Sequence, residues 1–316
     1  MINNLNITPE KPYFNKHYFC DYIELVSLVS NPCFLSKSDI LERFYQDEKN
    51  VTSGTIDNGN QDDKWESRVS DWFLMLDSRK NEFKDFYPFN INDNKISLKN
   101  NLNREHKAYI FLLLNSTQKY LNNTNNLTSD FELMSLEVLR KYLPKNSRSY
   151  KFGKSGVNNS RYKGCIETKI DLLAQDLQCK TNYEPYYFSS HDNGDGGLDL
   201  VAWTVFTPDD TNQNNIQIYL GQCATGKEWL SKQDDTEKFE SKYIDFQSNI
   251  NYMMFIPYDG RNLDRTFNEA GRMGKYLLFD RLRMLFLFDC NLTNNMPSFS
   301  VDSIIEATIQ YQENIV

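Results

Sequence analysis

Asp199 and Gln222 are the residues whose types and spacing best combine for chemistry. They lie in two apolar segments, NGDGGLDLVAWTVF and IQIYLGQCATGKEW, which the polar segment TPDDTNQNN joins. If these segments are the strands of a hairpin folded about residue 210 or 211, Asp199 lies opposite Gln222 at the end of an apolar strand face. A carboxylate beside an amide oxygen is a donor pair suited to Mg²⁺ or Mn²⁺, and the nearby Asp195 could add charge. The structural alternative is a turn-ending Asp199 and a hydrogen-bonded core amide at Gln222.

Glu132 is a candidate for the same site because it occupies a core-facing position of a predicted helix. Positions 132, 136, 139 and 143 form one helical stripe, and the other three residues are leucines. An acid on an apolar face needs a cationic partner. The alternative is an acid in the first helical turn, stabilised by the helix dipole after a Thr128 or Ser129 cap. The competing acid Glu167 has Asp171 one turn later, which indicates a solvent-exposed face.

A basic stretch follows the Glu132 helix directly. Eight basic residues and no acids lie between Arg140 and Lys163, interleaved with Tyr and Phe. Positive side chains among aromatic rings suit the phosphates and bases of nucleic acid, and a solvated loop is the alternative. The predicted nucleic-acid ligands are Arg148, Lys151, Lys154, Arg161 and Lys163.

Other catalytic patterns have less support. His191 lies in the turn-rich segment SSHDNGDGG, where a lone histidine is ordinarily structural or exposed. Neither a GxSxG elbow nor a GxxxxGK[ST] phosphate loop is present, and Cys223 alternates away from Gln222. The 6 cysteines are dispersed without a CxxC pair, which predicts reduced thiols and no zinc site. Arg281 and Arg283 precede an apolar run, which indicates a helix start leading into the core, although either could reach a phosphate.

Hydrophobic periodicity divides the chain near residue 126. The first part predicts helices in HYFCDYIELVSLV, SDILERFYQ, residues 65–83 and REHKAYIFLLLNSTQKYL, with a polar loop over residues 51–63 and a short extended segment in FYPFNINDNKISL. The second part predicts helices in DFELMSLEVLRKYL, CIETKIDLLAQDL, residues 237–247 and SVDSIIEATIQYQ, and strands in EPYYFSS, LDLVAWTVF, IQIYLGQCA and YMMFIPY. We therefore predict an α+β or α/β fold, with a mainly helical recognition or assembly region at 1–126 and a second domain at 127–316.

Composition and charge limit the functional classes. The 316 residues, 40% of them hydrophobic, are enough for one large domain or two. No apolar run reaches the roughly 18 residues of a membrane span and the start lacks a signal-peptide pattern, so we expect a soluble, cytoplasmic protein with no membrane partner. The net charge of −8 opposes general affinity for nucleic acid, but acids concentrate between Asp39 and Asp85, away from the basic stretch.

The segments that carry the candidate site resemble a known family. Phe131 and Glu132 on a helix, Gly-Leu-Asp ending at Asp199, and the strand of Gln222 are similar to the PD-(D/E)xK, or restriction-endonuclease-like, nucleases, in particular the glutamine variants near the Mrr type. The resemblance covers about residues 129–256. It implies a restriction-endonuclease-like mixed sheet flanked by helices, a metal ion (Mg²⁺ or Mn²⁺) held by Asp199, Gln222 and Glu132, and a lysine that orients or activates the attacking water. The implied activity is metal-dependent endonuclease cleavage of nucleic acid, of DNA in preference to RNA.

The sequence departs from the family pattern at the lysine. Ala224 stands two residues after Gln222, where the family has its lysine, so the candidates are Lys227 and Lys232. The GQC segment followed by Trp229 and Lys232 is similar to bacterial antiphage-defence proteins, which favours Lys232 and a role in defence. The acidic N-terminal region would then contact a partner protein of the defence system or a second copy of the chain, as a homodimer. The alternative is a catalytically degenerate nuclease-fold subunit that acts as a nucleic-acid-binding or protein-interaction module.

Overall fold

The chain separates into two units that are not the two contiguous domains of the prediction. A computed structural model describes residues 5, 9, 16–30, 33–51, 58–122, 125–152, 161–184, 186–188, 194–206, 215–268, 270–288, 306 and 308. Unit 1 comprises residues 1–127, 257–270 and 289–316, and unit 2 comprises residues 128–256 and 271–288. The first boundary lies next to residue 126, but two later segments group with unit 1. The predicted domain 127–316 is therefore corrected to a discontinuous unit, because contacts of distant segments are invisible to local periodicity.

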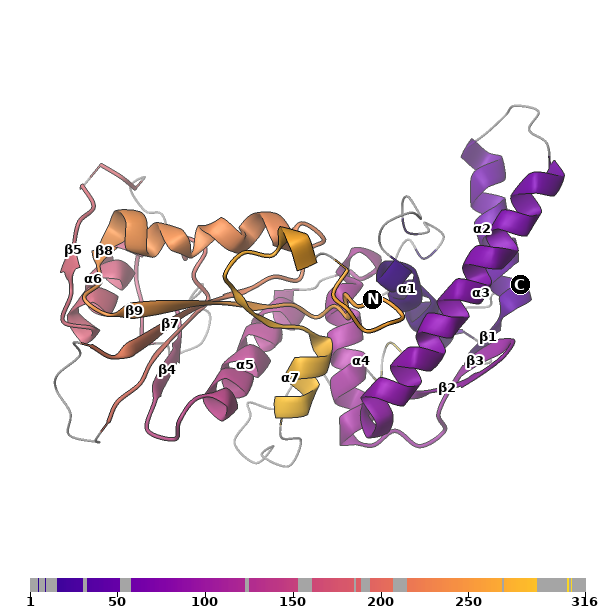
Figure 1. Cartoon of the computed structure of the whole chain (residues 1–316), viewed down its shortest axis with the longest axis horizontal. Coiled ribbons are helices and arrows are strands. Elements are labelled where there is room, and N and C mark those ends of the chain that lie inside the picture. Colours follow the sequence, from indigo (N-terminus) through magenta and orange to yellow (C-terminus); the bar gives the residue numbers. More distant parts are fainter. Residues whose placement is uncertain are drawn as a thin grey trace. The chain divides into compact units, whose positions relative to one another are not determined.

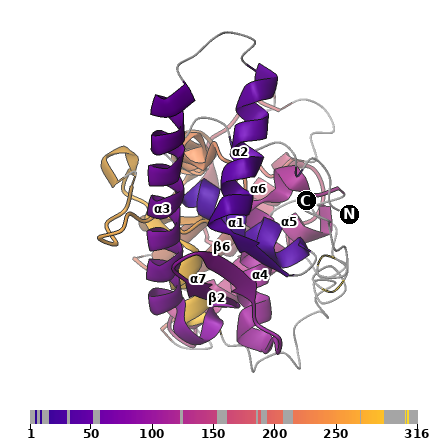
Figure 2. The same cartoon turned by 90° about the vertical axis from the view of Figure 1, so that its right-hand side faces the viewer.

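Unit 1 packs helices against a small antiparallel sheet with strand order β1-β3-β2 (Figure 1). Figure 2 shows its helices α1, α2, α3 and α4 from another side. The central helix is α1, in which every residue from Phe19 to Val29 is buried, as its nearly continuous apolar sequence requires. α4 begins at a reciprocal cap between the Asn103 and His106 side chains and backbone amides. The elements of unit 1 are α1 (Lys16–Val29), β1 (Phe34–Ser36), α2 (Lys37–Val51), α3 (Asn58–Phe83), η1 (Lys84–Phe86), β2 (Phe89–Asn92), β3 (Lys95–Leu98), α4 (Arg104–Ser116) and η2 (Gln118–Tyr120).

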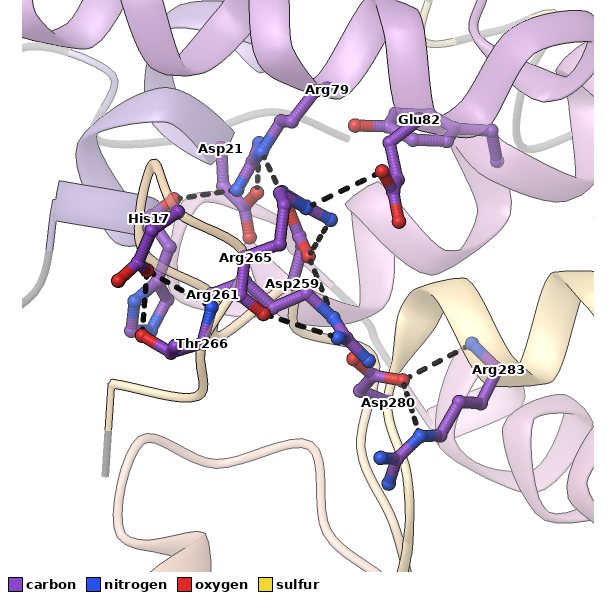
Figure 3. Close-up of polar contacts among 12 residues, drawn as sticks. His17, Asp21, Arg79, Glu82, Asp259, Arg261, Arg265, Thr266, Asp280 and Arg283 are labelled. Atoms are coloured by element: carbon purple, nitrogen blue, oxygen red, sulfur yellow. Dashed lines mark hydrogen bonds and ion pairs between the residues drawn. The ribbon is translucent and has the colours of Figure 1, made fainter. Parts of the chain in front are cut away.

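A buried network of charges lies inside unit 1 (Figure 3). Arg79 of α3 donates to Asp21 Oδ1 at 2.8 Å and to Asp259 Oδ2 at 3.2 Å, and its Nη1 lies 3.1 Å from Glu24 Oε2. Arg265 also donates to Asp259, at 3.2 Å. Because a buried charge is costly without a partner, this network ties residues 257–270 to α1 and α3.

Unit 2 is built on a mixed five-stranded sheet with strand order β10-β9-β7-β6-β4 (Figure 1). β4 pairs with β6 and β6 with β7 in antiparallel fashion, whereas β7 with β9 and β9 with β10 are parallel. The mixed architecture agrees with the predicted α+β or α/β class. The elements that form or accompany unit 2 are α5 (Asn125–Tyr142), β4 (Arg148–Lys151), α6 (Ile166–Asp176), β5 (Lys180–Thr181), β6 (Leu200–Trp203), β7 (Gln217–Cys223), η3 (Trp229–Asp235), η4 (Phe239–Tyr243), β8 (Ile244–Asp245), β9 (Asn249–Phe255), η5 (Ala270–Arg272), β10 (Leu277–Phe279) and α7 (Arg281–Leu287).

Helices cover both faces of this sheet. Val201, Trp203 and Leu220 belong to one buried cluster with Ile170 and Leu173 of α6, so α6 packs on that face. The other face meets α5, where the Ser135 hydroxyl hydrogen bonds to Cys223. The alternating strand residues thus send their side chains to two different helices.

Four local predictions are wrong. The segment EPYYFSS forms no strand in its described part, residues 184 and 186–188. The loop predicted over 51–63 is already helical from Asn58, and the helix predicted over 237–247 ends at Tyr243, where β8 follows. The basic stretch contains β4, which was not predicted. Lys154, His191 and most of SVDSIIEATIQYQ lie outside the described residues.

None of the described helices is both long and apolar enough to cross a membrane. Asp280 caps α7 through Arg283 N at 3.1 Å, and Arg283 Nη1 donates to Leu278 O at 2.8 Å. Arg281 is fully buried. These two arginines therefore support the structural interpretation.

Candidate active site

The β6–β7 hairpin places Asp199 against Gln222, as its sequence predicts. Leu200 pairs with Gly221 and Val201 with Leu220, and the same register continued by one residue sets Asp199 opposite Gln222. The Asp199 amide donates to Gly221 O at 3.0 Å, and the Cys223 amide donates to Asp199 Oδ2 at 2.7 Å. The backbone of β7 therefore fixes the carboxylate at the point where β6 begins.

Asp199 lies in an environment that disfavours its charge. Burial raises the pKa of the Asp199 carboxyl well above its usual value, and the negative charges of Glu132 and Asp195 raise it further. The Cys223 amide and the positive charge of Lys232 act in the opposite direction, with smaller effect. Burial and negative charge therefore outweigh the positive charge that acts on Asp199, and a bound cation would favour the ionised carboxylate.

Gln222 presents an acceptor oxygen without a donor. Its side chain is 5% exposed, and within the described part of the chain its buried Oε1 has no hydrogen-bond partner. Leaving a buried acceptor unsatisfied costs about 1–3 kcal/mol, so a structural amide would be expected to find a donor. This observation weighs against the alternative in which Gln222 is a satisfied core amide. A ligand or metal ion bound at this position would satisfy the Gln222 oxygen.

Glu132 lies on the buried stripe of α5, as predicted, and its partner is a lysine. Leu136 and Leu139 of the stripe are buried. Lys151 Nζ lies 2.5 Å from Glu132 Oε2 and donates to Ser129 Oγ at 3.2 Å. Because α5 begins at Asn125, Glu132 is not in the first helical turn, and the alternative based on the helix dipole is wrong.

The Glu132 carboxyl shares one electrostatic influence with Asp199, the charge of Asp195. Burial raises its pKa above the usual value, the Lys151 ammonium lowers it, and the Asp195 charge raises it again. Asp195 thus acts electrostatically on both Glu132 and Asp199. The structure therefore brings these acids and Lys151 into one electrostatic unit.

Lys151 belongs to the site, although its sequence context predicted only a nucleic-acid contact. β4 pairs antiparallel with β6 so that Lys151 faces Leu200, next to Asp199. Tyr150 and Phe152 pack on the α6 face of the sheet, so alternation sends Lys151 to the α5 face. The alternation in RSYKF was the available signal, and the surrounding basic turn residues concealed it.

A glycine-rich loop positions Asp195 and Asp199. Gly197 has φ +88°, and a Cβ there would lie 2.5 Å from Asp235 Cβ, so only glycine fits. The fully buried Lys169 of α6 donates to Gly194 O at 3.0 Å, and Gly197 N donates to Asp195 Oδ1 at 2.9 Å. The loop is thus held on both sides of the acids.

The two lysines predicted to complete the site are both exposed. Lys232 lies in η3, and its charge acts on the Asp199 pKa. Lys227 lies in the turn before η3. Ala224, in the position of the family lysine, is fully buried.

The predicted nucleic-acid ligands are not equivalent. Lys151 is paired with Glu132. Arg161 forms a two-pronged ion pair with Asp176 and lies over the Tyr150 ring. Lys163 is exposed and Arg148 is half-buried at the start of β4. Among the described residues of this stretch, Lys151 and Arg161 are therefore engaged by acids, whereas no ion pair engages Arg148.

The residues present fit a small divalent cation held in part by water. Among the described residues, no three His, Cys, Asp or Glu side chains come together to hold a metal ion. The predicted set has two carboxylates and the Gln222 amide, whose oxygen is buried and without a donor in the described structure. Mg²⁺ commonly binds through one or two carboxylates and retains waters, so this donor set is compatible with it.

In comparisons with known proteins, no family model, curated protein or solved structure matches this chain. The argument for a function therefore rests on the chemistry of the site. Its distinguishing features are a carboxyl group whose pKa burial raises, an amide oxygen that has no donor among the described residues, and a largely buried lysine–glutamate pair.

Proposed function

We propose that this chain is a metal-dependent nuclease with a PD-(D/E)xK-like, restriction-endonuclease-like site in unit 2. The observation that carries the proposal is that the buried Oε1 of Gln222, opposite the buried Asp199, has no donor in the described part of the chain. Glu132 and Lys151 add a second carboxylate and a cation on the neighbouring elements. This combination suits phosphodiester hydrolysis better than it suits a packed core.

Each side chain has a physical role in this reaction. Asp199, Gln222 and Glu132 would hold Mg²⁺ or Mn²⁺, leaving positions for water and a phosphate oxygen. The bound ion would polarise the scissile phosphate and lower the pKa of its water. The Cys223 amide orients the Asp199 carboxylate toward Gln222. Glutamine contributes no charge, and Asp195 adds negative potential at the site.

Lys151 takes the role that the family gives to the lysine two residues beyond Gln222. Its ammonium is largely buried and touches Glu132, whereas Lys232 and Lys227 are exposed. A cation in this place can orient the attacking water and stabilise the charge that develops on the phosphate. We therefore replace Lys232 by Lys151 as the proposed catalytic lysine, with Lys232 as an electrostatic contributor.

The substrate and setting extend the same proposal. We propose DNA as the preferred nucleic acid and bacterial antiphage defence as the setting, on the resemblance of GQC, Trp229 and Lys232 to defence proteins. Unit 1 would then bind a protein partner or a second copy of the chain.

Cleavage of plasmid DNA and labelled DNA and RNA oligonucleotides tests the proposal. We expect Mg²⁺- or Mn²⁺-dependent products from the wild type, no products with a chelator, and no products from Asp199→Ala or Glu132→Ala. Glu228→Ala, which removes an exposed acid of the same unit, is the matched control and should cleave normally. Absence of wild-type cleavage, or equal cleavage by Asp199→Ala, would rule the nuclease out.

A second candidate function is a noncatalytic nucleic-acid-binding or interaction subunit. Ala224 in the lysine position and the lack, among the described residues, of a cluster of three metal-binding acids favour it. This candidate predicts salt-dependent binding of nucleic acid without turnover at any divalent metal concentration. Metal-dependent cleavage that Asp199→Ala abolishes would exclude it.

A further inference from the structure

The basic residues that follow α5 divide into a paired group and an unpaired group. Lys151 is engaged by Glu132 and Arg161 by Asp176, so neither ammonium nor guanidinium is available without breaking an ion pair. Lys141 and Lys145 are exposed and Arg148 is half-buried, and in the described parts of the chain these three have no ion pair. We call these three residues the α5–β4 turn patch.

The backbone holds the α5–β4 turn patch in a defined shape. Ser147 N donates to Pro144 O at 2.9 Å, which closes a tight turn around Lys145. Arg140 pairs with Glu137 at 2.6 Å and donates to Ser149 O at 3.4 Å, so it braces the start of β4 against α5. The patch is therefore a positioned surface and not a loose tail.

An exposed aromatic ring accompanies these charges. Tyr142 lies between Lys141 and Lys145 in the sequence and is 45% exposed. Its ring packs edge-on against Phe279 at 5.3 Å, which fixes its orientation. A half-exposed ring that is held beside cations can stack on a base or sugar of nucleic acid.

The patch is separated from the candidate active site along both α5 and β4. Glu132 lies near the middle of α5 and pairs with Lys151 at the end of β4, whereas the turn joins the end of α5 to the start of β4 (Figure 1). At 1.5 Å per helical residue, the backbone of Lys141 lies about 14 Å along the axis from that of Glu132. This corresponds to about four base-pair steps of 3.4 Å.

We propose that the α5–β4 turn patch binds the phosphate backbone of the nucleic-acid substrate about four base pairs from the bond that is cleaved. This inference rests on the proposed function, because it assumes that the site at Asp199 is where the substrate reacts. In a chain with a net charge of −8, three unpaired cations beside a fixed ring form a local surface for a polyanion. Because α5 carries both Glu132 and Lys141, the helix sets the separation of these two residues.

Binding without turnover tests the patch independently of catalysis. In an Asp199→Asn background, we would compare the triple variant Lys141→Gln, Lys145→Gln and Arg148→Gln with the unaltered background on a labelled DNA duplex of about 20 base pairs at several salt concentrations. Each phosphate contact contributes about 0.9 to the slope of log affinity against log salt, so we expect the slope to fall by about 2–3. Affinity at low salt should fall about tenfold or more.

The matched control removes the same charge from other exposed positions of unit 2. The triple variant Lys180→Gln, Lys242→Gln and Lys275→Gln should keep the slope of the Asp199→Asn background. On duplexes shorter than about eight base pairs, which cannot extend four base pairs to one side of a central bond, the patch variant should lose its effect. Thermal unfolding of both triple variants should match the background.

The outcomes separate the patch from the nuclease proposal. Equal slopes for the patch and control variants, or no salt-dependent binding of nucleic acid, would overturn the patch. Selective loss of binding by the patch variant supports it even if the wild type fails to cleave, and that failure would count against the nuclease alone. An RNA duplex in a parallel series shows which backbone the patch prefers.

Discussion

Asp199 is subject to two opposing influences that a structural residue would avoid. Burial and the charges of Glu132 and Asp195 raise its pKa. The Cys223 amide, in contrast, donates a hydrogen bond to its carboxylate, which favours the ionised form. Opposite it, Gln222 Oε1 is buried without a donor in the described structure. Such local conflicts reduce stability, and proteins retain them where function requires them.

The raised pKa of Asp199 predicts a pH-dependent effect of Asp199→Asn on stability. The folded chain holds the proton of the Asp199 carboxyl more tightly than the unfolded chain does. The contribution of this group to the free energy of unfolding is therefore complete below the pKa it has in the unfolded chain. That contribution is lost as pH rises through the raised pKa of the folded chain. Asparagine mimics the protonated acid, so the Asp199→Asn variant does not lose this stabilisation as pH rises. We expect the free energy of unfolding of Asp199→Asn, without metal, to exceed that of the wild type near about pH 8 and to approach it near about pH 4.

Chemical denaturation at the two pH values measures this difference. If the proposed metal site exists, adding Mg²⁺ should raise the free energy of unfolding of the wild type, since the site would form only in the folded chain, and should affect Asp199→Asn much less. A variant that is less stable than the wild type at the higher pH would mean that the ionised carboxylate stabilises the fold.

Lys151 and Lys232 can be ranked by activity. Removing a charge that contacts the reacting phosphate costs about 10²–10³ in rate, so we expect Lys151→Met to lower kcat by that order. Lys232→Met should have a smaller effect, because its exposed charge reaches Asp199 only at long range. Single-turnover cleavage measures both, and the opposite ranking would return the catalytic role to Lys232.

Sequence alone was sufficient for residues whose position depends on strand or helix periodicity. Asp199 and Gln222 follow from one hairpin register, and Glu132 from one helical stripe. Lys151 could not be assigned in this way, because its partner is 19 residues away on another element. Its role depends on how β4 docks beside α5, which no local pattern encodes.

At the level of elements, the loop from Gly194 to Asp199 leads into β6 and is held to α6 by a hydrogen bond. Lys169 holds one end of this loop by donating a hydrogen bond to the Gly194 carbonyl. The backbone of Gly197 packs closely against Asp235 of η3. The Asp199 carboxylate is therefore positioned by a chain segment with little freedom to move.

Gly197→Ala tests the importance of that segment. A left-handed backbone costs about 1–3 kcal/mol for other residues, and the added Cβ would also collide with Asp235. We expect a loss of about that size in the free energy of unfolding, together with reduced cleavage. Gly226→Ala is the matched control, since a Cβ there meets no atom within 4 Å. Equal behaviour of the two variants in urea denaturation would contradict this prediction.

Element prediction succeeded where periodicity was long and failed where side-chain composition was misleading. The α5 and α6 helices and the β6–β7 hairpin have clear patterns. EPYYFSS has the aromatic content of a strand, but its described residues form a turn whose rings pack on Tyr243. β4 has only four residues within a basic stretch, and its pairing with β6 overrides that local composition.

At the level of the whole molecule, unit 1 depends on a segment that follows β9 in the sequence. Asp259 is fully buried between Arg79 and Arg265, and both arginines donate to it. Sequence periodicity suggested a boundary near residue 126 but could not indicate this return, because Asp259 and Arg79 are 180 residues apart.

Arg79→Met is expected to be among the most destabilising changes in unit 1. It would leave Asp21, Glu24 and Asp259 with too little compensating charge, and breaking a buried ion pair costs about 3–5 kcal/mol. Lys64→Met, which removes an exposed charge from the same helix, should be close to neutral. Hydrogen exchange should show faster exchange of α1 and α3 in Arg79→Met alone. Unchanged protection of these helices would show that the network is dispensable.

The return of residues 257–270 to unit 1 also bears on how the chain is made. When the ribosome has synthesised α1 and α3, Arg79 faces two acids of α1, but Asp259 is still 180 residues from being translated. The nascent N-terminal region therefore cannot complete its core before most of unit 2 has emerged. We expect a chain stalled before residue 257 to depend on chaperones and to be degraded readily, so unit 1 should finish folding only after residues 257–270 have been synthesised.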